Sequence, residues 1–110
     1  MFGSKLSKIE KLVEKKKDDE LAKLAESKDS EVQLAAIAGL GKVHGEAGFN
    51  MLVSLLRSPE SKVRIAVAHA MAEYSDSKLR AHIEHLLKSE ADPQVITALH
   101  DALGKIKGKN

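Results

Sequence analysis

Apolar residues along the chain follow a helical period rather than the alternation of a strand. In one clear stretch, Val63, Val67 and Met71 stand at i, i+4 and i+8, and apolar residues also occupy positions 70 and 74. This spacing places the apolar side chains on one face of an α-helix, and such a face must be buried. Because a helical period appears in every part of the pattern and strand alternation in none, the sequence predicts an all-α fold.

The helical pattern occurs three times. Val32, Val63 and Val95 are separated by 31 and 32 residues, and the extra residue falls in the loop around Glu90 and Ala91. Further apolar residues recur with offsets of 31 or 32: Leu40, Met71, Leu103; Val43, Tyr74, Ile106; and, in an earlier stripe of each period, Leu21, Leu52, Ile83. Each period therefore predicts two helices that a short turn joins into a helical hairpin.

Polar residues mark the ends of the second helix in each period. Asp92 can cap exposed amides at one start, and Pro93 suits the first helical position. Short polar stretches occupy the corresponding places in the other two periods. Gly41, Gly104 or the polar turn at 75–77 follows each apolar pattern. We therefore expect the second helices to stop at these residues.

One more helix is predicted before the first period, at residues 4–16. Ile9 and Leu12 lie 31 residues before Leu40 and Val43, so this helix is similar to the latter half of a second helix. Repeat proteins need polar-faced terminal units, which makes this helix a candidate cap. We predict a single domain over residues 1–110, made of the following parts: a capping helix at 4–16 and repeats at 18–44, 45–75 and 76–108.

The repeated segments carry a resemblance to a known family. The run from Asp92 to Ile106, "DPQVITALHDALGKI", and its echo "DSEVQLAAIAGLGKV" from Asp29 to Val43 resemble the HEAT-like repeat named after phycobilisome lyases. The resemblance covers roughly residues 18–108 and implies a short right-handed α-solenoid of three helical hairpins. Repeats of this type occur in scaffolds, lyase subunits and hydroxylases alike, so the resemblance leaves the function open. The middle unit departs from its neighbours at Ala72 and Tyr74.

Composition argues against several classes of function. Eighteen basic and sixteen acidic residues leave a formal charge of +2, which does not favour nucleic acid or an anionic membrane as the partner. Aromatic residues make up 3% of the chain, which leaves few stacking platforms for single-stranded nucleic acid. The chain has no cysteine, no secretory signal pattern and no apolar run of the roughly 20 residues that a membrane span needs. We expect a cytoplasmic protein that does not enter the membrane.

Candidate chemistry is sparse. His82 and His85 stand three residues apart, which would allow two ring nitrogens to share an ion, but no third ligand is identifiable and a solvated surface pair is the favoured interpretation. Related iron hydroxylases use recurring His-Glu pairs on their second helices, and the pair at 100–101 does not match that position. No spacing orients a nucleophile and a base. We therefore expect no enzyme activity, no catalytic residues, no metal and no cofactor.

The lysine run at 15–17 is followed directly by acidic residues at 18–20. Cations at the end of one helix and anions at the start of the next are each favoured by the helix dipole. This juxtaposition indicates a turn between two helices more strongly than it indicates a phosphate-binding site.

The candidate binding site lies on the second helices, which line the concave surface of solenoids of this type. Several positions between the buried stripes carry Leu or Ile, whereas a purely solvated face would carry more charge. The predicted binding residues are Leu34, Ile37, Arg64, Ile65, His69, Ile96 and His100. Three interpretations stay open: these side chains pack within the chain, bind a protein or peptide, or bind a small ligand.

The sequence thus predicts a protein interaction module or scaffold that binds a protein or peptide on its concave face, with self-association as a variant. The alternatives are an accessory subunit of a lyase-like enzyme and nucleic-acid binding. Nucleic acid is the less favoured partner, because a groove that binds it would carry far more than one arginine.

Overall fold

The computed structural model describes the backbone of residues 2–106 and the side chains of residues 5–106. Within this range the chain forms seven α-helices and no strand, which confirms the predicted all-α solenoid. The helices are α1 (Phe2–Glu14), α2 (Asp18–Leu24), α3 (Ser30–Lys42), α4 (Glu46–Leu55), α5 (Ser61–Tyr74), α6 (Leu79–Leu87) and α7 (Pro93–Lys105).

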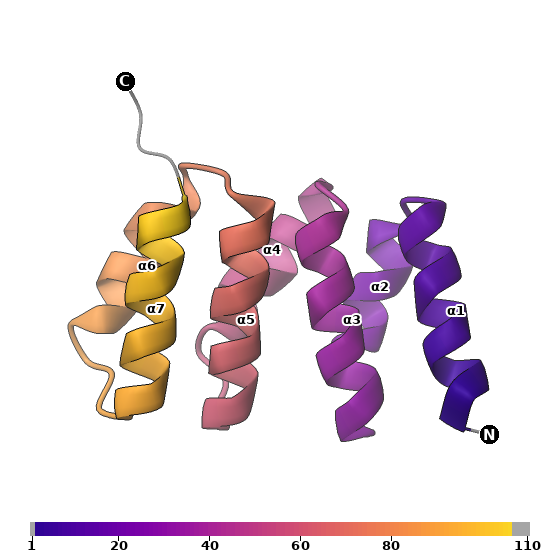
Figure 1. Ribbon diagram of the computed structural model, residues 1–110, viewed down its shortest axis with the longest axis horizontal. Helices are drawn as coiled ribbons and strands as arrows, with labels where there is room; N and C mark the ends of the chain where they lie inside the picture. Colours follow the sequence, from indigo (N-terminus) through magenta and orange to yellow (C-terminus); the bar gives the residue numbers. More distant parts are fainter. Residues whose placement is uncertain (1, 107–110) are drawn as a thin grey trace.

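The helices form two layers (Figure 1). The second helices of the three pairs, α3, α5 and α7, stand side by side in one layer, and the first helices α2, α4 and α6 lie behind them. Helix α1 joins the layer of second helices, next to α3. This placement agrees with the sequence register, in which Ile9 and Leu12 of α1 correspond to Leu40 and Val43.

Helix starts are set by local hydrogen bonds. The side chain of Asp29 accepts hydrogen bonds from the backbone amides of Glu31 and Val32 at 3.1 and 3.3 Å. Asp92 caps α7 in the same way by accepting from the amide of Gln94 at 2.8 Å, as the sequence predicts. Each cap satisfies amides that would otherwise be unpaired at a helix start.

Helix α4 receives its cap from another helix. Gly45 precedes α4 and has no side chain to offer, so the carboxylate of Asp18, at the start of α2, accepts a hydrogen bond from the amide of Gly48 at 3.1 Å. A Cβ atom at Gly45 would collide with this carboxylate. The glycine therefore leaves room for a contact that ties the first two repeats together.

The prediction that Gly41 and Gly104 end their helices is wrong. Helices α3 and α7 continue past them, to Lys42 and Lys105, and no glycine in the described part of the chain has a positive φ. A Cβ atom at Gly41 would lie 2.7 Å from the carbonyl oxygen of Ala70, so the glycine allows α3 and α5 to approach closely. The predicted turn after α5 is confirmed, because Ser75 ends that helix in the left-handed conformation with φ 59°.

The core runs without interruption along the solenoid between the two layers. Val63, Val67 and Met71 are fully buried on α5, as their helical spacing predicts, and they belong to the same core cluster as Leu52 and Ile83 of the first helices. No polar or charged residue that the structure describes is buried as a whole, although the side chain of Glu90 is only 4% exposed. Hydrophobic burial is therefore the main stabilising contribution, repeated from one helix pair to the next.

Candidate functional site

The candidate site is the part of the second helices that no other described helix covers, which we call the second-helix face and define by Leu34, Ile65, His69 and Ile96. Ile96 lies one turn before His100, so it belongs to the free side of α7, where no described helix follows. His69 is exposed, and the three aliphatic side chains are partly buried. Ile65 packs against the core. Leu34 and Ile96 are not among the partly buried side chains that pack against it in the described part of the chain. Leu34 and Ile96 therefore present apolar surface that the fold does not use.

Ile37 does not belong to this face, contrary to the sequence-based prediction. Its side chain is fully buried, as is Ala68, its counterpart in the next repeat. Ile37 lies one turn before Gly41 on the side of α3 that approaches α5, so the close packing of the two helices covers it. The same repeat position in α7 is His100, which is exposed because no described helix packs beyond α7. His100 therefore lies at the end of the layer rather than between two second helices.

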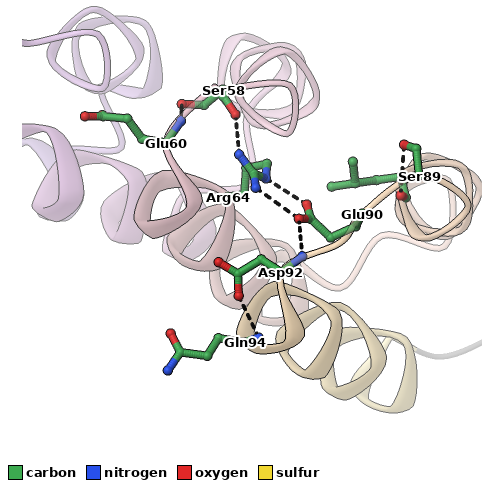
Figure 2. A network of polar contacts seen from close by, with 8 residues as sticks. Ser58, Glu60, Arg64, Ser89, Glu90, Asp92 and Gln94 are labelled. Carbon is green, nitrogen blue, oxygen red and sulfur yellow. Dashed lines mark hydrogen bonds and ion pairs between the residues drawn. The ribbon is translucent and has the colours of Figure 1, made fainter.

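Arg64 is predicted as a binding residue, but its charge is already paired. Its Nε donates to Oε1 of Glu90 at 2.7 Å and Nη2 donates to Oε2 at 3.0 Å, while Nη1 donates to the carbonyl oxygen of Ser58 at 2.8 Å (Figure 2). The carboxylate of Glu90 also accepts from the amide of Asp92 at 3.1 Å. Arg64 therefore joins the loops that precede α5 and α7 and is not available to a ligand.

The Arg64–Glu90 pair is largely shielded from solvent, and the hydrogen bond outweighs the cost of burying the two charges. The side chains of Arg64 and Glu90 are only 16% and 4% exposed. The hydrogen bond from Arg64 lowers the pKa of Glu90, and the same bond raises the pKa of Arg64. The sequence contains one signal of this contact, the extra residue in the loop around Glu90, which distinguishes this loop from its counterparts.

A groove opens in the same layer, between α1 and α3. It has a volume of about 590 Å³ and is lined by Leu6, Ile9 and Val13 of α1 and by Ala35, Ala38 and Gly39 of α3. Charged side chains complete the lining, namely Glu10, Glu14 and Lys42. The sequence does not predict this groove, because nothing in the helical period of α1 indicates how far the helix stands from α3.

Comparison with known families agrees with this architecture. The family model of HEAT repeats matches residues 18–104. The chain belongs to the HEAT-repeat family. The match covers all three helix pairs of the HEAT-repeat domain and leaves α1 outside. It does not distinguish the phycobilisome-lyase type from other HEAT repeats, and no curated protein matches the chain. HEAT repeats generally mediate protein–protein interaction.

A cluster of aromatic rings that the sequence did not predict extends from the end of the first HEAT repeat to the third. The ring of Tyr74 lies 4.9 Å from that of His44 and 5.9 Å from that of Phe49, and Phe49 lies 6.4 Å from His82. The Tyr74 hydroxyl donates to the carbonyl oxygen of Gly45 at 3.0 Å, and burial raises the pKa of Tyr74. Tyr74 thus fills a repeat position where the other two HEAT repeats carry Val43 and Ile106, and its ring joins the end of α5 to His44 of the first repeat.

The histidines of the HEAT repeats do not converge with other potential ligands. His82 and His85 are exposed on α6, and no group of three His, Asp or Glu residues in the described part of the chain could hold a metal ion. No helix within residues 2–106 is both long enough and apolar enough to span a membrane.

Proposed function

We propose that this HEAT-repeat chain is an interaction module that binds a protein or peptide on its second-helix face. The observation that carries the proposal is the presence of Leu34 and Ile96 on that face, apolar and outside the core packing. Partly exposed aliphatic side chains that the fold does not use are typical of surfaces that become buried in a complex. The family supports the same general role.

The arrangement of charge favours a protein partner over nucleic acid. Arg64 is paired with Glu90, and Lys42 lies 3.5 Å from Glu73 on the neighbouring helix. A nucleic-acid groove requires several basic side chains free to contact phosphates. The second-helix face therefore offers apolar contacts rather than a positively charged surface. The proposal includes a cytoplasmic location and a protein as the partner.

Binding without catalysis is also part of the proposal. The groups whose pKa values are shifted serve structural contacts: Arg64 with Glu90, Lys5 with Asp29, and the partly buried Tyr74. Catalytic sites instead place shifted groups in a cleft where a substrate can reach them. The alternative role as an accessory subunit of a lyase would require a bound chromophore or enzymatic turnover. A mass spectrum and an absorbance spectrum of the purified protein would detect a bound chromophore.

The proposal is tested with a face variant and a matched control. Affinity capture from the native lysate identifies the partner, and its affinity is then measured for the wild type and for Leu34→Asp with Ile96→Asp. We expect this double variant to weaken binding at least about tenfold, since truncating central apolar contacts of an interface typically has such an effect. A double variant on the opposite layer, Ser54→Asp with His85→Asp, should bind normally. Equal affinity of both double variants, at unchanged melting temperature, would rule out the second-helix face as the binding surface.

A further inference from the structure

The groove between α1 and α3 arises from a break in the contact pattern of the second helices. Gly41 of α3 faces Ala70 of α5 at close range. One repeat earlier, 31 residues before each of these two, the corresponding residues are Glu10 of α1 and Gly39 of α3. A glutamate side chain cannot enter a contact that is tight even for a single Cβ atom. Helix α1 therefore stands further from α3 than α3 does from α5, and the space between them stays open as the groove.

The α3 side of the groove is apolar and is formed by residues with small side chains or none. Ala35 and Ala38 expose only small side chains, and Gly39 exposes none, with Val13 of α1 so near that a Cβ atom at Gly39 would lie 2.9 Å from its Cγ2 atom. Leu6 and Val13 are partly exposed along the α1 side. Small residues on one wall and aliphatic residues on the other allow the backbone of an incoming segment to approach closely.

Helix α1 carries its negative charges on the side that lines the groove and its described lysines elsewhere. Both of its glutamates, Glu10 and Glu14, line the groove and are exposed, and neither makes an ion pair or side-chain hydrogen bond with another described residue. Lysines 5, 8 and 11 do not line the groove, and Lys5 is held by Asp29 at 2.8 Å. Lys42 is at the α3 side but lies within 3.5 Å of Glu73. The α1 wall of the groove is therefore negatively charged.

We propose that this groove binds an amphipathic helical segment of a protein partner that carries apolar residues on one side and Lys or Arg on the adjoining flank. This inference rests on the proposed function and specifies the chemistry of the partner. Leu6 and Glu14 are eight residues apart, so the groove follows roughly 12 Å of α1. This length accommodates about two turns of the partner's helix. Apolar residues at i, i+4 and i+7 of that helix would cover the apolar α3 side of the groove.

The spacing of Glu10 and Glu14 determines the spacing expected for the basic residues of the partner helix. Glu10 and Glu14 are four residues apart and lie on the same side of α1, one turn from each other. Basic residues three or four apart on the partner helix match this separation. Their contribution should be modest and sensitive to salt, because both carboxylates are exposed.

The test uses two synthetic helical peptides with the same leucines at i, i+4 and i+7. One carries lysines on the flank and the other carries glutamates at the same positions, and fluorescence anisotropy measures their affinities for the full chain. We expect the lysine peptide to bind about tenfold more tightly, the size expected from two exposed ion pairs. Glu10→Gln with Glu14→Gln should remove most of this difference. Glu46→Gln with Glu84→Gln, two exposed glutamates on first helices, should leave it unchanged.

A second variant tests the location rather than the charge. Ala38 is exposed, so Ala38→Tyr should fold normally, fill the groove and weaken both peptides. The inference is overturned if the lysine peptide does not bind, if both peptides bind equally, or if Ala38→Tyr leaves binding unchanged. The proposed function fails separately, when Leu34→Asp with Ile96→Asp does not weaken the captured partner. A partner that is weakened by that pair but not by Ala38→Tyr or the glutamate variants would retain the proposed function and reject this inference.

Discussion

The close approach of α3 and α5 at Gly41 leads to a prediction in which two substitutions of the same kind have opposite effects. A Cβ atom at Gly41 would lie 2.7 Å from the carbonyl oxygen and 2.9 Å from the Cα atom of Ala70, whereas ordinary van der Waals contact begins near 3.4 Å. The contacted atoms belong to the backbone, so no side-chain rotation can relieve the collision. Gly41→Ala therefore forces the two helices apart.

The expected magnitude comes from two opposing effects. Alanine is favoured over glycine in a helix by up to about 1 kcal/mol. Overpacking a tight contact costs roughly 1 to 3 kcal/mol. We expect Gly41→Ala to lower the free energy of unfolding by about 1 kcal/mol on balance.

Gly104→Ala is the matched control. Gly104 occupies the same repeat position, also one residue before the end of its helix, but a Cβ atom there would have no heavy atom within 4 Å. The gain in helix propensity then acts alone, so this variant should be more stable than the wild type by up to about 1 kcal/mol.

Urea unfolding followed by far-ultraviolet circular dichroism measures both changes. The two variants should differ by roughly 1 to 3 kcal/mol, which reports the overpacking alone because the helix-propensity effect is shared. If Gly41→Ala is stabilised as much as Gly104→Ala, the tight contact between α3 and α5 does not exist. If Gly104→Ala is destabilised as much as Gly41→Ala, the assignment of Gly104 to an open surface is wrong.

Two further predictions concern the ion pair and the core. Glu90→Gln should lower the free energy of unfolding at neutral pH by about 2 kcal/mol, because it removes the charged partner of Arg64. The hydrogen bond from Arg64 lowers the pKa of Glu90, so this stabilisation is present above the unfolded carboxyl pKa of about 4.3 and is lost as the pH falls through the lower folded value. Unfolding measured across this range should show the variant converging on the wild type in acid, and a difference independent of pH would contradict the ion pair. Val63→Asp should abolish cooperative thermal unfolding, because Val63 is fully buried and the carboxylate would be unpaired there. His69→Asp on the same helix should melt like the wild type, because His69 is exposed. Equal melting temperatures of the two variants would mean that the buried face of α5 is misassigned.

The sequence alone determined the number and type of the helices and the faces that they bury. Helical periodicity and capping depend on residues within about one turn of each other, so they can be read from a single segment. Asp92 caps α7 and Val63, Val67 and Met71 form a buried stripe, as their spacing predicts. The 31-residue period also indicated that α1 belongs with the second helices, because Ile9 repeats the role of Leu40.

Tertiary structure decided which residues between the buried stripes remain accessible. Ile37 and Ile65 both lie outside the stripe, yet Ile37 is fully buried and Ile65 is partly exposed. The period of one helix does not reveal how closely the next helix approaches, and here that distance depends on Gly41, which the sequence suggested only as a helix end. The same property explains the groove, since its opening depends on α1 carrying Glu10 at the repeat position where α3 carries Gly41.

Charge pairing between repeats was also decided by the fold. Arg64 and Glu90 are 26 residues apart and lie in different helix pairs, so no local rule connects them, and the sequence predicts Arg64 as a binding residue. The folded loops bring the guanidinium and the carboxylate to 2.7 Å and exclude most of the solvent. Local interactions thus fixed the helices of this protein, whereas the distances between helices, which depend on side chains from both partners at once, fixed its available surface.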